Sequence, residues 1–270
     1  MFSLGAGDAL VGVTRFCDYP PDVFQKEIPR LTNMLDVSPE MLLTVAPDLV
    51  VLDNLNFNLK DRIENLGIDV FVLRSDNIPT LCDSIEGLGS VLNLRERGSE
   101  IASSIRSELE RIRLLTNGLP RPRVAIAVDR DVKDPLIHSL YIAGRESFYD
   151  ELINLSGGEN AFNMAGVTYP RMSAEGLLAL DPDVIIDIVG SHAGYELNSG
   201  AIQSAIQNQW KSLPELKAVR GARVYLVQGD EALRPGPRII GVLRRFAIFI
   251  HPELASEIDT RPLNKTTCSK

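Results

Sequence analysis

A run of apolar and polar positions occurs twice in the chain, first as VSPEMLLTVAPDLVVLD from Val37 and again as MSAEGLLALDPDVIIDI from Met172. In each copy a serine (Ser38 or Ser173) precedes a carboxylate and paired leucines, which is the pattern of a short amphipathic helix with its N-cap. A Pro-Asp step ends that helix. The β-branched run that follows, LVVLD or VIIDI, predicts a strand that is buried on both faces of a parallel sheet.

Each copy lies among further strand and helix patterns. In the first half ALVGVTRF precedes the copy, and the helical LKDRIENL and the strand GIDVFVL follow it. In the second half RPRVAIAVD precedes the copy and GARVYLVQ follows it. The halves are therefore predicted to form two α/β lobes of similar plan. The alternative is one continuous doubly wound sheet in which the helix-Pro-Asp-strand unit recurs.

A long amphipathic pattern separates the two halves. Ile101, Ile105, Leu109 and Ile112 recur at helical spacing, and Asn117-Gly118 ends the run. The pattern predicts one helix of about 22 residues, which leaves little room for hinge motion, so a cleft between the lobes is expected to be preformed. The predicted organisation is an N-terminal α/β lobe at 1–93, a linking helix at 94–118, a C-terminal α/β lobe at 119–259 and a frayed tail at 260–270.

The amino-acid composition and the motifs exclude several classes of function for this chain. With 44% hydrophobic and 24% charged residues, the 270-residue chain can bury a sizeable core. A net charge of −8 argues against a nucleic-acid partner. The spacing of a metal site is found neither among the three cysteines (Cys17, Cys82, Cys268) nor among the three histidines (His138, His192, His251). The sequence also contains no catalytic-nucleophile motif and no phosphate-binding loop motif. The sequence therefore predicts no catalytic residue and no metal ligand.

Polar and aromatic residues gather in loops that follow predicted strands. In an α/β lobe such loops face a ligand cleft. Tyrosine rings offer flat area at low entropic cost and a guanidinium binds an oxygen, which suits a bulky ligand that is partly apolar and partly anionic. The other interpretation is that the tyrosines fill the bases of their loops. The candidate ligand-binding residues in these loops are Arg15, Tyr19, Pro20, Tyr141, Tyr169, Arg171, Asp230 and Arg234.

A family resemblance covers the chain from residue 4 to about residue 253. Five segments together, in their order along the chain, resemble the substrate-binding proteins of ABC importers for iron complexes and cobalamin. They are VGVTRFCDYPPDV, the helix-PDLVV unit, LGIDVFVL, SGGENAF, and RPGPR before a helix ending HPE. The resemblance implies the α/β class III periplasmic-binding-protein fold, with two Rossmann-like lobes joined by one long α-helix. It also implies a monomer that holds a corrinoid or ferric chelate between its lobes, needs no cofactor and docks on a membrane permease.

The resemblance extends to individual residues. CDYPP is similar to the loop with which cobalamin-binding members touch the corrin, which implies contacts by Tyr19 and Pro20, and Tyr169 matches their second-lobe aromatic loop. Asp53 stands where the cobalamin binders have a tryptophan, so binding of a ferric siderophore or haem stays open. For permease docking, Glu231 matches the second-lobe carboxylate. Two residues, Asp61 and Glu64, compete for the first-lobe position.

The start of the sequence bears on the cellular compartment in which the protein is expected. Family members begin with an export signal, a strand and a serine-proline segment, and the similarity here begins after them. The N-terminal strand of the first lobe is therefore expected to be missing, with Met1 at an internal helix position. The resemblance implies a protein of the periplasm or a lipid-anchored protein of the cell surface. A cytoplasmic α/β enzyme or sensor that uses the same cleft is the alternative.

Overall fold

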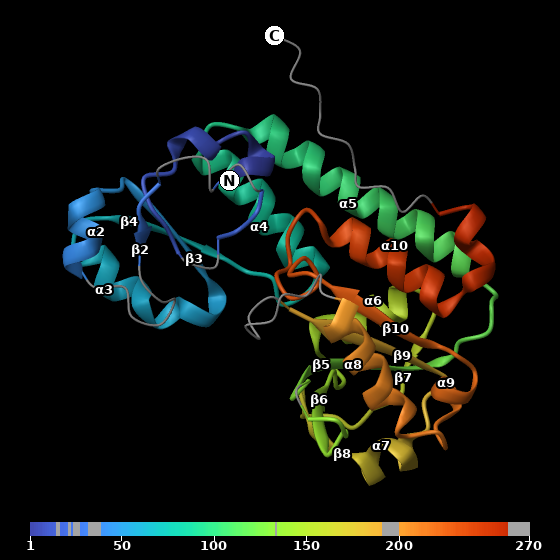
Figure 1. Cartoon of the computed structure of the whole chain (residues 1–270). Helices are drawn as coiled ribbons and strands as arrows, with labels where there is room; N and C mark the ends of the chain where they lie inside the picture. The colour runs from blue at the N-terminus through green and yellow to red at the C-terminus, as the bar shows by residue number, and fades with distance from the viewer. Residues whose placement is uncertain are drawn as a thin grey trace. The chain divides into compact units, whose positions relative to one another are not determined.

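The computed structural model describes residues 1–14, 17–20, 23, 28–31, 39–132, 134–190 and 200–258. The chain is a mixed α/β protein that divides into two compact units, Met1–Ser104 and Ile105–Lys270 (Figure 1). The described strands form three separate sheets, so the alternative of one continuous doubly wound sheet is wrong. Among the described helices, none is both long enough and apolar enough to cross a membrane.

The first unit contains two small parallel sheets. In one sheet β1 pairs with β2, and in the other β3 pairs with β4. Apolar side chains from α2, η3 and α3 pack against the second sheet around Leu52. The elements of this unit are η1 (Phe2–Leu4), η2 (Gly7–Ala9), β1 (Val13–Thr14), β2 (Arg30–Leu31), α2 (Pro39–Val45), β3 (Leu49–Asp53), η3 (Asn54–Leu59), α3 (Lys60–Glu64), β4 (Asp69–Leu73) and α4 (Ile78–Val91).

The first copy of the repeated unit folds as helix α2 followed by strand β3, as predicted. The prediction that this strand is buried on both faces is wrong, since Val51 is 37% exposed and only Leu52 is buried. The reason is that the apolar cluster of this unit packs on the face that carries Val50 and Leu52, whereas Val51 points to the opposite face. The predicted cap, Ser38, lies outside the described residues.

The long helix predicted between the halves is α5 (Arg95–Thr116), and its 22 residues match the predicted length (Figure 1). The division between the two units falls within it, after Ser104. Ile105 and Ile112 are buried, as their helical spacing predicts. Near its start α5 crosses α4 at close range, because a Cβ on Gly89 would lie only 3.1 Å from Cα of Gly98.

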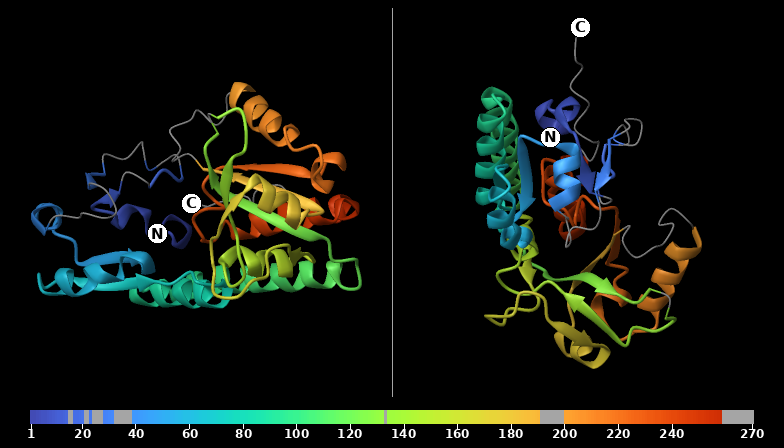
Figure 2. Two further views of the ribbon diagram at one scale, coloured as in Figure 1. Left: turned by 90° about the horizontal axis from the view of Figure 1, so that it is seen from below. Right: turned by 90° about the vertical axis from the view of Figure 1, so that its left-hand side faces the viewer.

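The second unit is built on one sheet with the strand order β10-β9-β5-β6-β8, and β7 also pairs with β5. Figure 1 labels these strands, and Figure 2 shows the same sheet from two further directions. β10, β9 and β5 are parallel, whereas β6 and β8 continue the sheet in antiparallel pairs. The elements are β5 (Arg123–Arg130), β6 (Ser139–Ile142), α6 (Phe148–Leu155), β7 (Glu159–Asn160), β8 (Arg171–Ser173), α7 (Ala174–Leu180), β9 (Val184–Val189), α8 (Gly200–Lys211), α9 (Lys217–Arg220), β10 (Val224–Gln228), α10 (Ile239–Ile250) and η5 (Pro252–Ser256).

Helices cover both faces of this sheet. On one face Ile185 belongs to a core cluster with Trp210 of α8. On the other face Val124 lies against Ile153 of α6 and Ile250 of α10, because a Cβ placed on Gly158 would contact all three within 3.1 Å. All residues of β9 are buried, which confirms the prediction for the second copy. Its helix begins as predicted, with the hydroxyl of Ser173 accepting from the Gly176 amide at 3.2 Å.

Candidate functional site

Three side chains of the second unit lie in a row on neighbouring strands. Tyr141 of β6 pairs with Arg171 of β8 on one side and with Asp129 of β5 on the other. Residues that pair directly across antiparallel strands point to the same face of the sheet. All three are exposed, Tyr141 to 41%, whereas Leu140 and Ile142 point into the core. We call this set the Asp129–Tyr141–Arg171 row.

A β-bulge in β5 decides which residues join the row. The register with β6 jumps from Ala127 to Asp129 and leaves Val128 as the extra residue. An extra residue shifts the alternation of side chains by one position. Asp129 therefore points to the exposed face, and the side chain of Arg130, only 3% exposed, turns toward the core.

A neighbouring hydroxyl fixes the guanidinium of Arg171. Its Nε and Nη2 both donate to Oγ of Ser139, at 3.1 and 2.9 Å. Ser139 lies two residues before Tyr141 in β6, so both point to the same face of that strand. The guanidinium of Arg171 is thus held alongside the ring of Tyr141.

Two tyrosines border the row. Tyr169, 44% exposed, contacts the ring of Tyr149 edge to face with 6.4 Å between centroids. The buried Tyr149 hydroxyl donates to the carbonyl oxygen of Ala232 at 2.9 Å. Burial raises the pKa of both phenols, and for Tyr149 the neighbouring Tyr169 adds to the effect. The loop that carries Tyr169 passes Gly144, where a Cβ would lie 2.1 Å from the Val167 carbonyl, so only glycine fits.

The loop after β10 carries the predicted ligand residues Asp230 and Arg234. Their side chains form an ion pair at 2.8 Å, with Asp230 buried and the Arg234 side chain 27% exposed. Because Ala232 of the same loop accepts from Tyr149, the loop is fastened against α6. The two predicted residues therefore lie in the loop whose backbone contacts Tyr149.

The predicted docking carboxylate of the second unit, Glu231, is engaged within its own unit. Its Oε1 accepts from Arg245 of α10 at 2.7 Å, and Arg238 lies 3.7 Å from its Oε2. The carboxylate is 23% exposed. Docking through Glu231 would thus compete with two intramolecular arginines.

The two docking candidates of the first unit differ in their surroundings. Asp61 is exposed in the first turn of α3. Glu64, one turn later, forms an ion pair with Lys60. Asp61 is therefore the more accessible carboxylate of the two.

A pocket of about 330 Å³ opens beside the row, at the carboxyl ends of β5 and β9. Asp129 belongs to both the row and the pocket. In α/β sheets ligands bind at the carboxyl ends of the strands, so the row and this pocket together form the candidate ligand site of the second unit. The lining residues are Val128, Asp129, Arg130, Val132, Asp187, Ile188, Val189, Gly190 and Leu233.

A buried ionic network lies under this pocket. Arg130 pairs with Asp187 and also donates to the side chain of Gln209. The indole of Trp210 donates to the same Asp187 oxygen at 2.7 Å, and its ring lies 5.4 Å from the guanidinium carbon of Arg130. Within the described residues, Nε of Arg130 has no hydrogen-bond partner. The network ties the ends of β5 and β9 to α8 and makes a rigid floor for the pocket.

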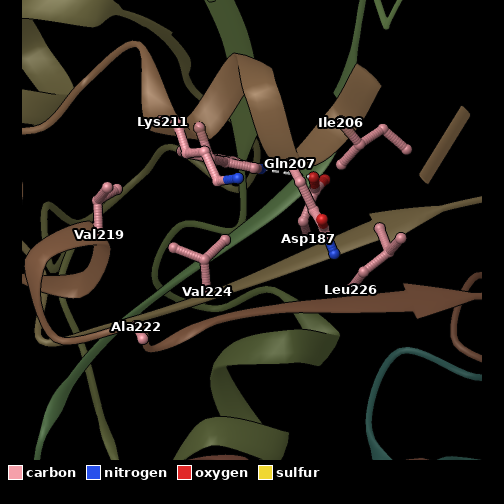
Figure 3. A pocket seen from close by; sticks show the side chains of 9 residues that line it. Asp187, Ile206, Gln207, Lys211, Val219, Ala222, Val224 and Leu226 are labelled. Atoms are coloured by element: carbon pink, nitrogen blue, oxygen red, sulfur yellow. Dashed lines mark hydrogen bonds between the residues drawn. The ribbon is translucent and has the colours of Figure 1, made fainter. Parts of the chain in front are cut away.

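A second pocket of about 310 Å³ lies between α8 and the strands β9 and β10 (Figure 3). It shares Asp187 with the first pocket, but its other walls are mainly aliphatic, such as Ile206 of α8 and Leu226 of β10. Both aliphatic side chains face the core cluster of the sheet, away from the row. The first pocket is the one that adjoins the row, through Asp129.

In the first unit, the loop after β1 presents Tyr19, which is 55% exposed, and then Pro20. Arg30 of β2 holds the start of this loop, since its Nη1 donates to the carbonyl oxygens of Thr14 and Cys17 at 3.4 and 3.2 Å. The predicted ligand residue Arg15 lies outside the described residues. Tyr19 therefore stands on an anchored loop.

Asp53, the predicted contact at the end of β3, serves the backbone. Its Oδ1 accepts from the Leu55 amide at 2.8 Å and caps η3. The large side chains that this turn exposes are apolar, with Leu55 83% and Phe57 56% exposed. Sequence reasoning missed these two, although apolar residues between asparagines in NLNFN directly after a strand are a readable signal.

Among the predicted ligand residues, the structure gathers Tyr141, Tyr169, Arg171, Asp230 and Arg234 around one end of the second unit. It adds Asp129 and Tyr149, which the sequence analysis did not select. A charged run after a strand, AVDRD, could have indicated Asp129. The position of Tyr149 depends on the packing of α6 and had no signal in the sequence.

Comparisons with known proteins agree with this fold. The family described as periplasmic binding protein matches residues 1–231. The chain is 26% identical over 262 residues to the uncharacterized ABC transporter substrate-binding lipoprotein YvrC of Bacillus subtilis, covering 95% of this chain and 77% of that protein. It is 25% identical over 244 residues to the vitamin B12-binding protein of Vibrio parahaemolyticus, covering 90% and 82%. The structure of the periplasmic heme-binding protein RhuT from Roseiflexus superposes with a TM-score of 0.73 at 24% identity, covering 93% of each chain.

Proposed function

The chain belongs to the periplasmic binding protein family, and on that premise we propose that it captures a corrinoid of the cobalamin type and delivers it to the permease of an ABC importer. One relative is named as an ABC transporter substrate-binding lipoprotein and another as a vitamin B12-binding protein. The chain is therefore a binding protein and not an enzyme, which removes the alternative of a cytoplasmic α/β enzyme.

The observation that carries the corrinoid proposal is the exposed surface around the row. Tyr141 and Tyr169 expose their rings there, beside the charged groups of Asp129 and Arg171. A corrinoid is a broad macrocycle with amide groups around its edge. Rings offer it contact area, while a carboxylate and a guanidinium offer an acceptor and a donor for its amides. The relative from Vibrio parahaemolyticus, which is named as a vitamin B12-binding protein, supports the same ligand class.

In this proposal the two units act as Rossmann-like lobes joined by α5, with the ligand held between them. The second unit contributes the row, and the first contributes Tyr19 together with the exposed Leu55 and Phe57. These three side chains supply the apolar contact area that a tryptophan in place of Asp53 would otherwise provide. The uninterrupted α5 supports a site that changes little on binding.

A ferric siderophore or haem is the second candidate ligand. Asp53 in place of the expected tryptophan and the superposition with the heme-binding protein RhuT favour it. The exposed rings and charged groups of the row favour the corrinoid.

The proposed partner is an ABC permease. Its arginines would meet Glu231 on the second unit and Asp61 or Glu64 on the first. Since the Bacillus relative is named a lipoprotein, we place the protein outside the cytoplasmic membrane, either in a periplasm or anchored by lipid.

Thermal unfolding with and without ligand tests this function. A ligand at 100 times its Kd stabilises the folded state by about 2.7 kcal/mol, which for a chain of this size raises the Tm by about 5 to 10 °C. We expect this shift with cyanocobalamin, followed by circular dichroism, and a smaller one with Tyr141→Ala. A shift with hemin or a ferric siderophore instead would select the second candidate. No shift with any of the three would refute the uptake function.

A further inference from the structure

The row is asymmetric in its hydrogen-bonding chemistry. Asp129 only accepts hydrogen bonds, Arg171 only donates them, and the ring of Tyr141 lies between them. Neighbouring strands are about 4.8 Å apart, so the acid and the base stand about 10 Å apart across the ring. A flat ligand lying on Tyr141 can therefore place different edge groups at the two ends of the row.

At one end of the row the exposed side chain is the carboxylate of Asp129. The nearest cation in sequence, Arg130, is 3% exposed and paired with the equally buried Asp187, so it offers no charge to a ligand. A ligand carboxylate at this end meets like charge, whereas a primary amide can donate an N–H to Asp129.

The β-bulge at Val128 creates this arrangement. Without the bulge, the alternation of side chains along β5 would turn Asp129 inward and Arg130 outward. The row would then present an arginine at each end, Arg130 and Arg171. Such a surface would suit a ligand with carboxylates. The bulge reverses the preference by exposing the acid and burying the base.

We propose that Asp129 makes the second unit selective for ligands whose edge groups are neutral amides and against ligands that carry carboxylates there. This inference rests on the proposed corrinoid function and sharpens it. Cobalamin, whose peripheral acid groups are amidated, fits the row. Haem, with two propionates, and corrinoids with a free acid at this edge do not.

The test compares cyanocobalamin with its separated monocarboxylic acids, in each of which one peripheral amide is hydrolysed. Kd is measured by isothermal titration calorimetry for the wild type and for Asp129→Asn. For at least one acid we expect the wild type to bind about tenfold more weakly than cyanocobalamin. In Asp129→Asn that ratio falls to less than about threefold, mainly because the acid binds more tightly.

Asp131→Asn is the matched control, since it removes the same charge two residues away and outside the row. It should leave the wild-type ratio unchanged. The inference is wrong if the wild type binds every acid as well as cyanocobalamin, if Asp129→Asn weakens all ligands equally, or if Asp131→Asn lowers the ratio as much. In those cases the corrinoid function itself stands. If cyanocobalamin does not bind at all, or hemin binds in its place, both the inference and the corrinoid function are refuted.

Discussion

Arg130 and Asp187 form a buried ion pair in the second unit. Both side chains are almost fully shielded from water. Desolvating two charges is costly, and the hydrogen bonds of Trp210 to Asp187 and of Arg130 to Gln209 offset part of that cost. Losing one partner leaves the other as an uncompensated buried charge.

Arg130→Met should therefore lower the free energy of unfolding by about 3 to 5 kcal/mol, because it strands the carboxylate of Asp187. Urea denaturation measures this loss. The double variant Arg130→Met, Asp187→Leu should recover much of it, since neither charge remains. Arg171→Met, an exposed arginine of the same sheet, serves as the control and should change stability by less than about 0.5 kcal/mol. A loss below 1 kcal/mol in Arg130→Met would mean that the Asp187 carboxylate is solvated.

Tyr19 is the aromatic anchor that we assign to the first unit. Tyr19→Ala should weaken cyanocobalamin binding by about 1 to 3 kcal/mol, as loss of an aromatic contact in an interface does. Titration calorimetry measures the change. Tyr19→Phe keeps the ring and should retain most of the affinity. If Tyr19→Ala binds as tightly as the wild type, Tyr19 is not a ligand contact.

At the level of helices and strands, Glu108 joins α5 to α10. It accepts from Arg244 of α10 at 2.8 Å and from Arg111 of α5 at 3.2 Å. Burial opposes the ionisation of Glu108, but the hydrogen bonds and charges of the two arginines outweigh it and hold its pKa below the ordinary value. This pair fastens the second half of α5 to the C-terminal helix.

A lowered pKa makes the contribution of Glu108 depend on pH. Its stabilisation is complete above the ordinary glutamate pKa of 4.5 and is lost as the pH falls through the lower folded value. Glu108→Gln should therefore be less stable than the wild type at pH 7, and the difference should shrink toward pH 3. Thermal midpoints across this range measure it. Glu110→Gln removes a solvent-exposed pair with Arg113 on the same helix, and should have a much smaller effect. Equal effects of the two variants would contradict a special role for Glu108.

The repeated unit shows how far sequence could predict these elements. Both copies form the expected helix and strand, and Ser173 caps its helix, because capping and periodicity are local properties. Burial is not local. VIIDI is enclosed because strands and helices from elsewhere in the chain cover it, whereas LVVLD lacks that cover. The same limit applies to the bulge at Val128, since the sequence alone does not specify which strand residue lies unpaired.

At the scale of the whole molecule, the site could be predicted in part. The sequence predicts loops for Tyr141, Tyr169 and Arg171. This is confirmed for Tyr169, but it is wrong for Tyr141, which lies within β6, and for Arg171, which begins β8, because these short strands form by pairing with distant parts of the chain. Asp53 was selected by position in a family pattern, and the structure shows its carboxylate capping η3. Asp129 was missed because its exposure follows from strand register.

The continuous α5 leads to a prediction for the molecule in solution. Hinge closure needs loop residues that change their backbone angles, and a 22-residue helix offers none along its length. Addition of cyanocobalamin should therefore change the radius of gyration by less than about 1 Å in small-angle X-ray scattering. A larger decrease would show that the two units close on the ligand, and that α5 is not a rigid connection.

Trp210 is the only tryptophan in the chain, and its indole lies against the floor of the candidate ligand site. All tryptophan emission therefore originates at one known position. Corrinoids and haem absorb light in the range where an indole emits, so a bound ligand should quench this emission by energy transfer without any attached dye. The protein thus contains its own optical sensor, with which ligand occupancy can be followed in real time during handover to a permease.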